Sequence, residues 1–147
     1  MLRLASVGSG SKGNATLVAT DETTILIDCG FPVREMLVRL PQLGVDISDI
    51  DAILVTHEHS DHIGGVAAVA KAAGAQVFAT HGTVASGKLD AVRSLVRIDS
   101  DSSFTIGDIE VNAVTVPHDA REPVQYRFHC GASCVGVLTD LGWVSPH

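Results

Sequence analysis

The sequence predicts one α/β domain in which helices pack against a mixed β-sheet. Residues 24–28 and 52–56 are short apolar runs rich in β-branched side chains, and each precedes a segment with helical spacing. From about residue 95 the apolar spacing changes to strict alternation, which is typical of antiparallel strands. The 147 residues are 46% hydrophobic and 18% charged, so the chain can bury a core and is not disordered.

Two helices are expected after these runs. Pro32 is expected at the first helical position, an apolar face runs along 33–40, and Pro41 and Gly44 are expected to stop the helix. The second helix is expected over 66–73, where apolar residues recur at the same spacing. Gly74 is its expected left-handed cap.

Further strands are expected in both halves of the chain. A run at 76–79 extends the first group of strands, and a hairpin is expected around the two-residue turn Gly107-Asp108. Alternation at 124–128 and an apolar run at 134–138 predict two more strands. Together these segments predict an α/β sandwich with helices against the sheet.

Composition and charge restrict the function classes. The chain has ten Lys and Arg and 17 Asp and Glu, which gives a net charge of −7. This charge argues against a protein that binds nucleic acid non-specifically through basic residues. It does not argue against a nuclease whose metal ions bind the phosphate. No apolar run is long enough for a membrane span or a signal peptide, so we expect a cytoplasmic protein. Cys29, Cys130 and Cys134 lack metal-site spacing and are expected to be reduced thiols.

A glycine-rich segment at 8–13 matches the dinucleotide fingerprint, with Asp28 near the expected ribose-binding position. That function needs a helix after the last glycine, whereas residues 14–20 look like a strand. Two interpretations remain open, a hairpin turn or a loop that offers backbone N–H groups to a phosphate.

The decisive segment is 56–65, Thr-His-Glu-His-Ser-Asp-His-Ile-Gly-Gly. It follows a buried strand and precedes a helix, at the strand end where α/β folds place chemistry. On an extended segment His57 and His59 point the same way, so both imidazoles can reach one metal ion. Asp61 and His62 then turn toward a neighbouring position. Imidazoles and carboxylates crowded in this way have no packing purpose without a cation. The alternative is that Asp61 is only a helix-capping residue.

With this motif the sequence resembles the metallo-β-lactamase-fold hydrolases. The matching positions are Asp28-Cys29-Gly30, the histidine motif, His118 after the run 114–116, and Asp140 at the end of 137–139. Segments 8–14, 118–123 and 139–142 look like the YycJ/WalJ (VicX) group of cytoplasmic, DNA exonuclease-like phosphodiesterases. The resemblance implies a metallo-β-lactamase-like αββα sandwich, incomplete at its C-terminal side. Residues 1–147 would then be a single domain that is the N-terminal part of a longer one, and Ser145-Pro146 would begin a helix.

The resemblance also implies roles for individual residues. His57, His59 and His118 would hold one of two divalent ions, Zn or Mn, Asp61 and His62 would hold the second, and Asp140 would bridge them. A hydroxide shared by the ions would attack phosphorus in DNA, and Asp61 is the residue expected to act in catalysis. The carboxylates expected to accept the other ring N–H of the ligating histidines are Asp28, Glu58 and Asp119.

Two alternatives remain at this stage. One is a cytoplasmic thioesterase or lactone hydrolase on the same fold, since fold alone does not select a substrate. The other is a truncated, non-catalytic fragment. His81 and His129 are expected to be structural or exposed, and the sequence does not determine the oligomeric state.

Overall fold

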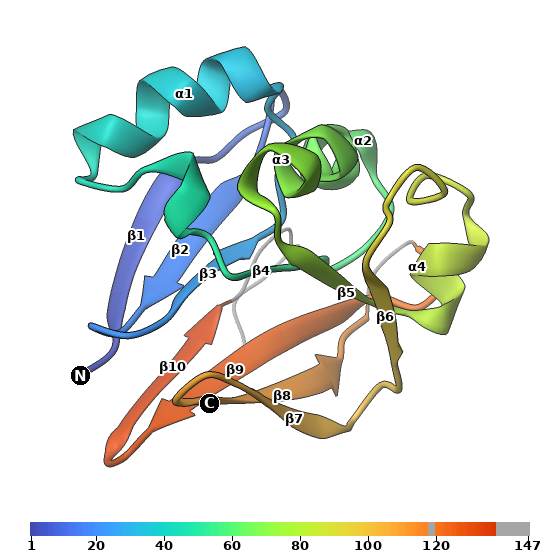
Figure 1. Cartoon of the computed structure of the whole chain (residues 1–147). Coiled ribbons are helices and arrows are strands. Elements are labelled where there is room, and N and C mark those ends of the chain that lie inside the picture. Colours follow the sequence, from blue (N-terminus) through green and yellow to red (C-terminus); the bar gives the residue numbers. More distant parts are fainter. Residues whose placement is uncertain (118–119, 138–147) are drawn as a thin grey trace.

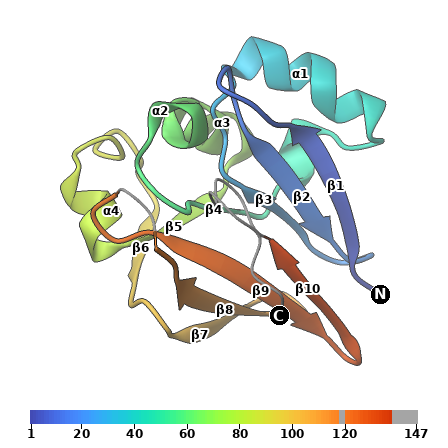
Figure 2. The same ribbon diagram turned by 180° about the vertical axis from the view of Figure 1, so that it is seen from behind.

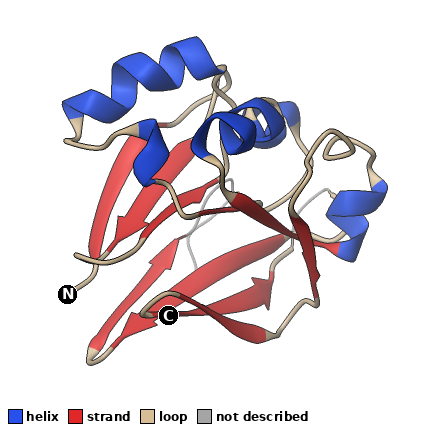
Figure 3. Cartoon of the chain, viewed as in Figure 1, coloured by secondary structure: helices blue, strands red, loops and turns tan. Residues whose placement is uncertain are grey.

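Two stacked β-sheets with helices on the outer face of the first form the molecule (Figures 1 and 3). The computed structural model describes residues 1–117 and 120–137. In Figure 2, seen from behind, the four-stranded sheet lies below the six-stranded sheet. Helices α1 and α3 lie above the six-stranded sheet. Within the described residues the layers are therefore helix, sheet and sheet, as the predicted sandwich requires.

The first sheet has six strands in sequence order, β1 to β6. Pairing is antiparallel among β1, β2 and β3, and parallel from β3 through β6. The carboxyl ends of β3, β4 and β5 therefore open onto one edge of the sheet, where the histidine motif begins. The strands are Arg3–Gly8, Ala15–Ala19, Thr24–Ile27, Ala52–Leu54, Gln76–Thr80 and Leu95–Ile98.

The second sheet is antiparallel throughout, in the order β10-β9-β8-β7. Its strands are β7 Ser103–Ile106, β8 Ile109–Thr115, β9 Val124–Cys130 and β10 Ser133–Val137. The predicted hairpin is confirmed, and Gly107 takes a φ of 56° in its turn, which glycine adopts without steric cost.

The helices are α1 Val33–Gln42, α2 Ser60–Ile63, α3 Val66–Ala73 and α4 His81–Ala85, with a 3₁₀ turn η1 at Ile47–Asp49. Gly74 is the left-handed cap of α3, as predicted. The expectations for both prolines were wrong. Pro32 is the N-cap of α1, one position before the first helical residue. Pro41 lies inside the last turn, where it has no N–H to donate to the carbonyl of Leu37, and the helix ends one residue later at Gln42. Gly44 follows the C-cap Leu43 with a left-handed φ of 73°, at the point where the helix stops.

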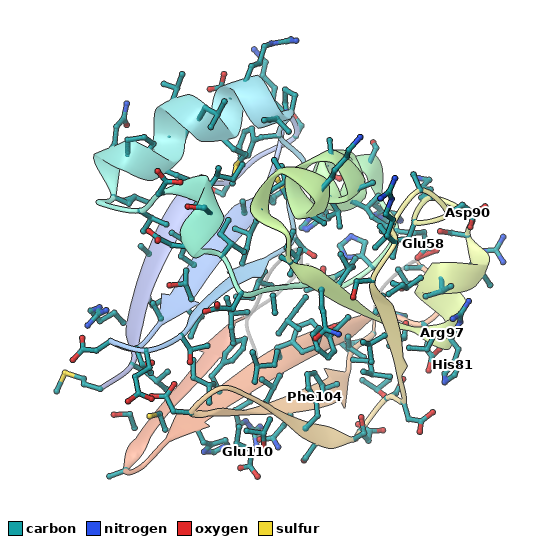
Figure 4. All side chains as sticks on the ribbon, in the orientation of Figure 1. Glu58, His81, Asp90, Arg97, Phe104 and Glu110 are labelled. Carbon is teal, nitrogen blue, oxygen red and sulfur yellow. The ribbon has the colours of Figure 1, made fainter. Side chains whose placement is uncertain are left out.

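Strand alternation divides the apolar residues between two cores. Leu26 of β3 faces the helices and packs with Met36 and Leu40 of α1. Its neighbours Ile25 and Ile27 face the other way and pack in the core between the two sheets. In the same inter-sheet core Phe104, which is labelled in Figure 4, packs against β5. Its ring stacks on that of Phe78 with centroids 5.2 Å apart. A sheet covered on both faces holds the strand ends rigidly, which positions the site.

The glycine-rich segment joins β1 to β2, which pair antiparallel. This excludes the βαβ arrangement of a dinucleotide fold. The segment is the turn of a β-hairpin, and a role of its backbone N–H groups toward a phosphate stays a prediction. In the described part of the chain, no helix has the length and apolar character needed to cross a membrane.

Candidate metal centre

The histidine motif begins directly after the buried strand β4 and ends in the short helix α2. Thr56 and His57 are almost fully buried, at 2% and 1% exposure, whereas His59 lies at the N-cap of α2 and is half-buried. Asp61 is in the first turn of α2 and His59 is the N-cap, so the alternative that Asp61 caps this helix is wrong. Both predicted strands are shorter than expected, since β3 ends at Ile27 and β4 at Leu54.

Three imidazole rings gather at this point. The ring centroids of His57 and His59 are 4.6 Å apart, and those of His57 and His62 are 4.2 Å apart. The Nε2 atom of His62 lies 3.7 Å from Oδ2 of Asp61. The structure therefore brings together the four motif residues that the sequence analysis selected.

Asp28 lies behind these rings, at the end of β3, and is 1% exposed. Its Oδ2 atom is 2.7 Å from Nδ1 of His62, and its Oδ1 atom accepts the backbone N–H of Thr56 at 2.7 Å. The Thr56 hydroxyl donates to Oδ2 at 2.6 Å. One carboxylate thus holds both ends of the motif.

These contacts determine the tautomer of His57. A hydroxyl has a single hydrogen, which Thr56 gives to Asp28. The Thr56 oxygen, 2.8 Å from Nδ1 of His57, is therefore left to accept the Nδ1–H of that ring. His62 presents its own Nδ1 to the Asp28 carboxylate. In both rings Nε2 then carries the lone pair that a metal ion requires.

Burial raises the pKa of Asp28, and the hydrogen bond from His62 acts against this rise. The backbone of Asp28 has a φ of 60°, a left-handed conformation that Asp tolerates better than most residues. The next residues are bound to the motif through backbone hydrogen bonds, from Cys29 N to His62 O at 2.7 Å and from Gly65 N to Cys29 O at 2.8 Å. A side chain at Gly30 would meet the Asp61 carbonyl oxygen at 2.1 Å, so this turn requires glycine.

Glu58 points toward the segment that precedes β9. Its carboxylate accepts the backbone N–H of Arg121 at 3.1 Å, and its own carbonyl accepts from Nζ of Lys88 at 2.8 Å. The Glu58 carboxylate therefore binds the backbone of the loop before β9, and not a histidine ring as expected from the sequence.

Three predicted site residues, His118, Asp119 and Asp140, lie outside the described residues. The described residues near position 118 contact the motif strand. Val124 N donates to Thr56 O at 3.0 Å, and the buried hydroxyl of Tyr126 donates to Val55 O at 2.6 Å. Burial raises the pKa of Tyr126, so this hydroxyl stays a donor.

The donor set fits a borderline divalent ion, which binds imidazole nitrogen and carboxylate oxygen. Within residues 1–117 and 120–137, no group of three or more His, Cys, Asp or Glu side chains is placed so that it could hold a metal ion. The predicted set draws its further ligands from His118 and Asp140.

A family model described as the metallo-beta-lactamase superfamily matches residues 8–130. The chain belongs to this superfamily. The match runs from β2 through β9, includes the Asp28 turn and the histidine motif, and confirms the predicted fold.

The relatives of this superfamily chain include exodeoxyribonucleases. It is 37% identical over 153 aligned residues to exodeoxyribonuclease YycJ of Bacillus anthracis, covering 98% of this chain and 56% of that protein. It is 34% identical over 146 residues to exodeoxyribonuclease WalJ of Streptococcus pneumoniae, covering 95% and 54%. The chain therefore spans about half the length of the curated relatives it matches.

Solved metallo-β-lactamases share the fold. Rm3 metallo-beta-lactamase superposes with a TM-score of 0.74 at 23% identity, covering 90% of this chain and 56% of that one. A B3 metallo-beta-lactamase with an active-site glutamic acid gives 0.74 at 25% identity, with 91% and 57% covered.

The other histidines and thiols behave as expected where the structure describes them. His81 is exposed at the N-terminus of α4, with Nε2 3.2 Å from Oδ1 of Asp99 (Figure 4). His129 lies on β9 and is half-buried. Cys29 and Cys130 are free thiols, and burial raises the pKa of Cys29 to about 12.

Sequence reasoning assigned no role to Thr56 or Asn14, although both stand inside segments quoted for the superfamily resemblance. Thr56 is the first residue of the histidine motif and Asn14 the last of the glycine-rich segment. Their contacts reach residues 28 and 47 positions away, to Asp28 and Asp61. The signal that could have identified them is their place at the boundary of a segment that resembles the superfamily.

Proposed function

We propose that this chain is a metal-dependent phosphodiesterase that acts on DNA. The observation that carries the proposal is the histidine cluster at the end of β4, in which buried partners hold the Nδ1 atoms of His57 and His62. The printed names of the relatives, exodeoxyribonuclease YycJ and WalJ, support DNA as the substrate class.

The proposed ligands are His57, His59 and His118 for one ion and Asp61 and His62 for the other, with Asp140 between them. Two divalent ions, Zn²⁺ or Mn²⁺, would supply a nucleophile from water near neutral pH and neutralise charge on the phosphate oxygens. The residues of the chain provide the geometry for this chemistry.

Each described residue has a positioning task. Asp28 and Thr56 orient the rings so that Nε2 faces the site. Glu58 holds the backbone at Arg121, close to the position of His118 in the sequence. Because Asp28 also binds the backbone of Thr56, a change at Asp28 would disturb both proposed ion positions.

Substrate choice tests this proposal. The purified chain, loaded with Zn²⁺ or Mn²⁺, should cleave bis(p-nitrophenyl) phosphate and linear DNA, and chelation with EDTA should abolish both activities. His57→Ala should remove the activity, and the matched control His81→Ala should retain it. Cleavage of a thioester or a cephalosporin in preference to the phosphodiesters would contradict the proposal. A metal-loaded chain inactive on all these substrates would favour the non-catalytic alternative.

A further inference from the structure

The glycine-rich turn between β1 and β2 ends at Asn14, whose side chain reaches the histidine motif. Its amide Nδ2 atom lies 3.1 Å from Oδ2 of Asp61 and 3.3 Å from the Asp61 carbonyl oxygen. The other contacts of the side chain are within its own turn, where Nδ2 donates to Gly10 O at 2.9 Å and Oδ1 accepts from Gly10 N at 3.2 Å. The side chain thus connects the turn to Asp61.

The backbone at this point is held independently of the side chain. Asn14 N donates to Asp61 O at 2.7 Å, and Gly30 N donates to Asn14 O at 3.1 Å. These two bonds need no particular residue at position 14, so truncation of the side chain leaves them in place. The contact that only asparagine supplies is the amide donor to the Asp61 carboxylate.

The same carboxylate oxygen faces His62. Oδ2 of Asp61 lies 3.7 Å from Nε2 of His62, which is too long for a hydrogen bond. Two atoms that each lie about 2.1 Å from one ion at a tetrahedral angle are roughly 3.4 Å apart, so this separation suits two ligands of a single ion. The Asp61 side chain is 27% exposed, and the Asn14 amide donates a hydrogen bond to it.

We propose that Asn14 is a positioning residue that holds the Asp61 carboxylate beside Nε2 of His62, ready to bind a divalent ion. The inference rests on the proposed function, because it requires Asp61 and His62 to be metal ligands. The oxygen that accepts from Asn14 keeps a second lone pair for the ion. Asn14 would therefore tune metal affinity without touching the metal.

Two variants separate the amide donor from the bulk of the side chain. Asn14→Ala removes the donor, and contacts of this kind behind a metal ligand change affinity about 10- to 100-fold. Asn14→Leu keeps nearly the size of the side chain and removes the donor without adding a charge. The positioning role predicts that Asn14→Leu binds metal as weakly as Asn14→Ala. A packing role predicts that Asn14→Leu restores the affinity.

Two further variants control for indirect effects. Gly44→Ala strains the turn after α1, because Gly44 has a φ of 73°, and it leaves the contacts of Asn14 and Asp61 untouched. Asn112→Ala removes the other asparagine side chain, which donates to Ser103 Oγ in the distant β7–β8 hairpin. Both variants should bind metal within about twofold of the wild-type chain.

The measurement is the dissociation constant for Zn²⁺ and for Mn²⁺ alone, from competition with a chelating dye, together with thermal unfolding of the metal-free proteins. We expect weaker binding in both Asn14 variants with little change in metal-free unfolding. Wild-type affinity in Asn14→Leu, or an equal loss in Gly44→Ala, would overturn the inference and leave the proposed function standing. A wild-type chain that binds neither ion would overturn both.

Discussion

At the residue scale, one hydroxyl hydrogen determines which nitrogen of His57 faces the site. Thr56 gives that hydrogen to Asp28 and accepts from His57, so a threonine that ligates nothing controls the tautomer. Valine has nearly the same shape and lacks the hydroxyl, which makes Thr56→Val a direct test of this arrangement.

Thr56→Val should lower both stability and metal affinity. The buried Asp28 oxygen and the Nδ1 atom of His57 would lose a partner, at a cost of about 1–3 kcal/mol in the free energy of unfolding. Urea denaturation and metal titration measure the two effects. The control is Thr105→Val on the exposed side of β7, which should change neither quantity. If Thr56→Val binds metal normally, the tautomer argument is wrong.

The histidines themselves provide a second test. His59→Ala should abolish tight metal binding and hydrolysis, because the ion loses one of its imidazole ligands and its affinity for the site falls. His81→Ala should do neither, since His81 contacts Asp99 on the exposed surface. Metal content of the two purified variants decides the matter, and an equal loss in both would disprove the ligand assignment.

At the element scale, a single carboxylate connects the two sheets at the end of the β7–β8 hairpin. Asp108 accepts hydrogen bonds from Thr20 and Thr23, in the turn between β2 and β3, at 2.8 and 2.7 Å. Next to it a side chain at Gly107 would meet the Thr23 hydroxyl at 2.1 Å, so the two turns are in close contact.

The hydrogen bonds from Thr23 and Thr20 lower the pKa of Asp108. Because the pKa is lower in the folded chain, the stabilisation is complete above the unfolded value of about 3.9 and is lost as the pH falls through the folded value. Asp108→Asn should therefore lower the melting temperature at pH 7. The difference from wild type should shrink on acidification below pH 4. A difference independent of pH would show that the charge of Asp108 has no part in the contact.

The predictability of the elements follows from their burial. The helix from Val33 and the β7–β8 hairpin were predicted because each buries one face, which imposes a period on the sequence. The edge strand β1 had no such signal, since it exposes side chains on both faces. The other edge strand, β6, has four residues, which is too short a run to show a period. The ligand candidates followed from local spacing. The bond between Asn14 and Asp61 joins residues 47 apart, and no local pattern encodes such a contact.

At the scale of the whole molecule, the superfamily fold places the histidine motif where two β-sheets and a layer of helices meet. That residues 1–147 form the N-terminal part of a longer domain stays a prediction, and the chain spans about half the length of its curated relatives. The cytoplasmic location also stays a prediction.

Metal binding should stabilise the whole fold, because the proposed ligands come from several elements. An ion present at 100 times its dissociation constant would raise the free energy of unfolding by about 2.7 kcal/mol if it binds only the folded state. Unfolding with Zn²⁺ and then with EDTA measures this increment. His59→Ala should lose most of it, and an increment of the same size in His59→Ala would place the ion elsewhere.

The most direct test of the proposed metal centre is a crystal structure of the chain grown with Zn²⁺ or Mn²⁺, with anomalous data collected at the metal edge. The account predicts one anomalous peak at Nε2 of His57 with His59 and His118 around it, and a second at His62 and Asp61 with Asp140 between the two. A structure in which His118 lies across the molecule from His57, or in which the ion binds away from the end of β4, would contradict it.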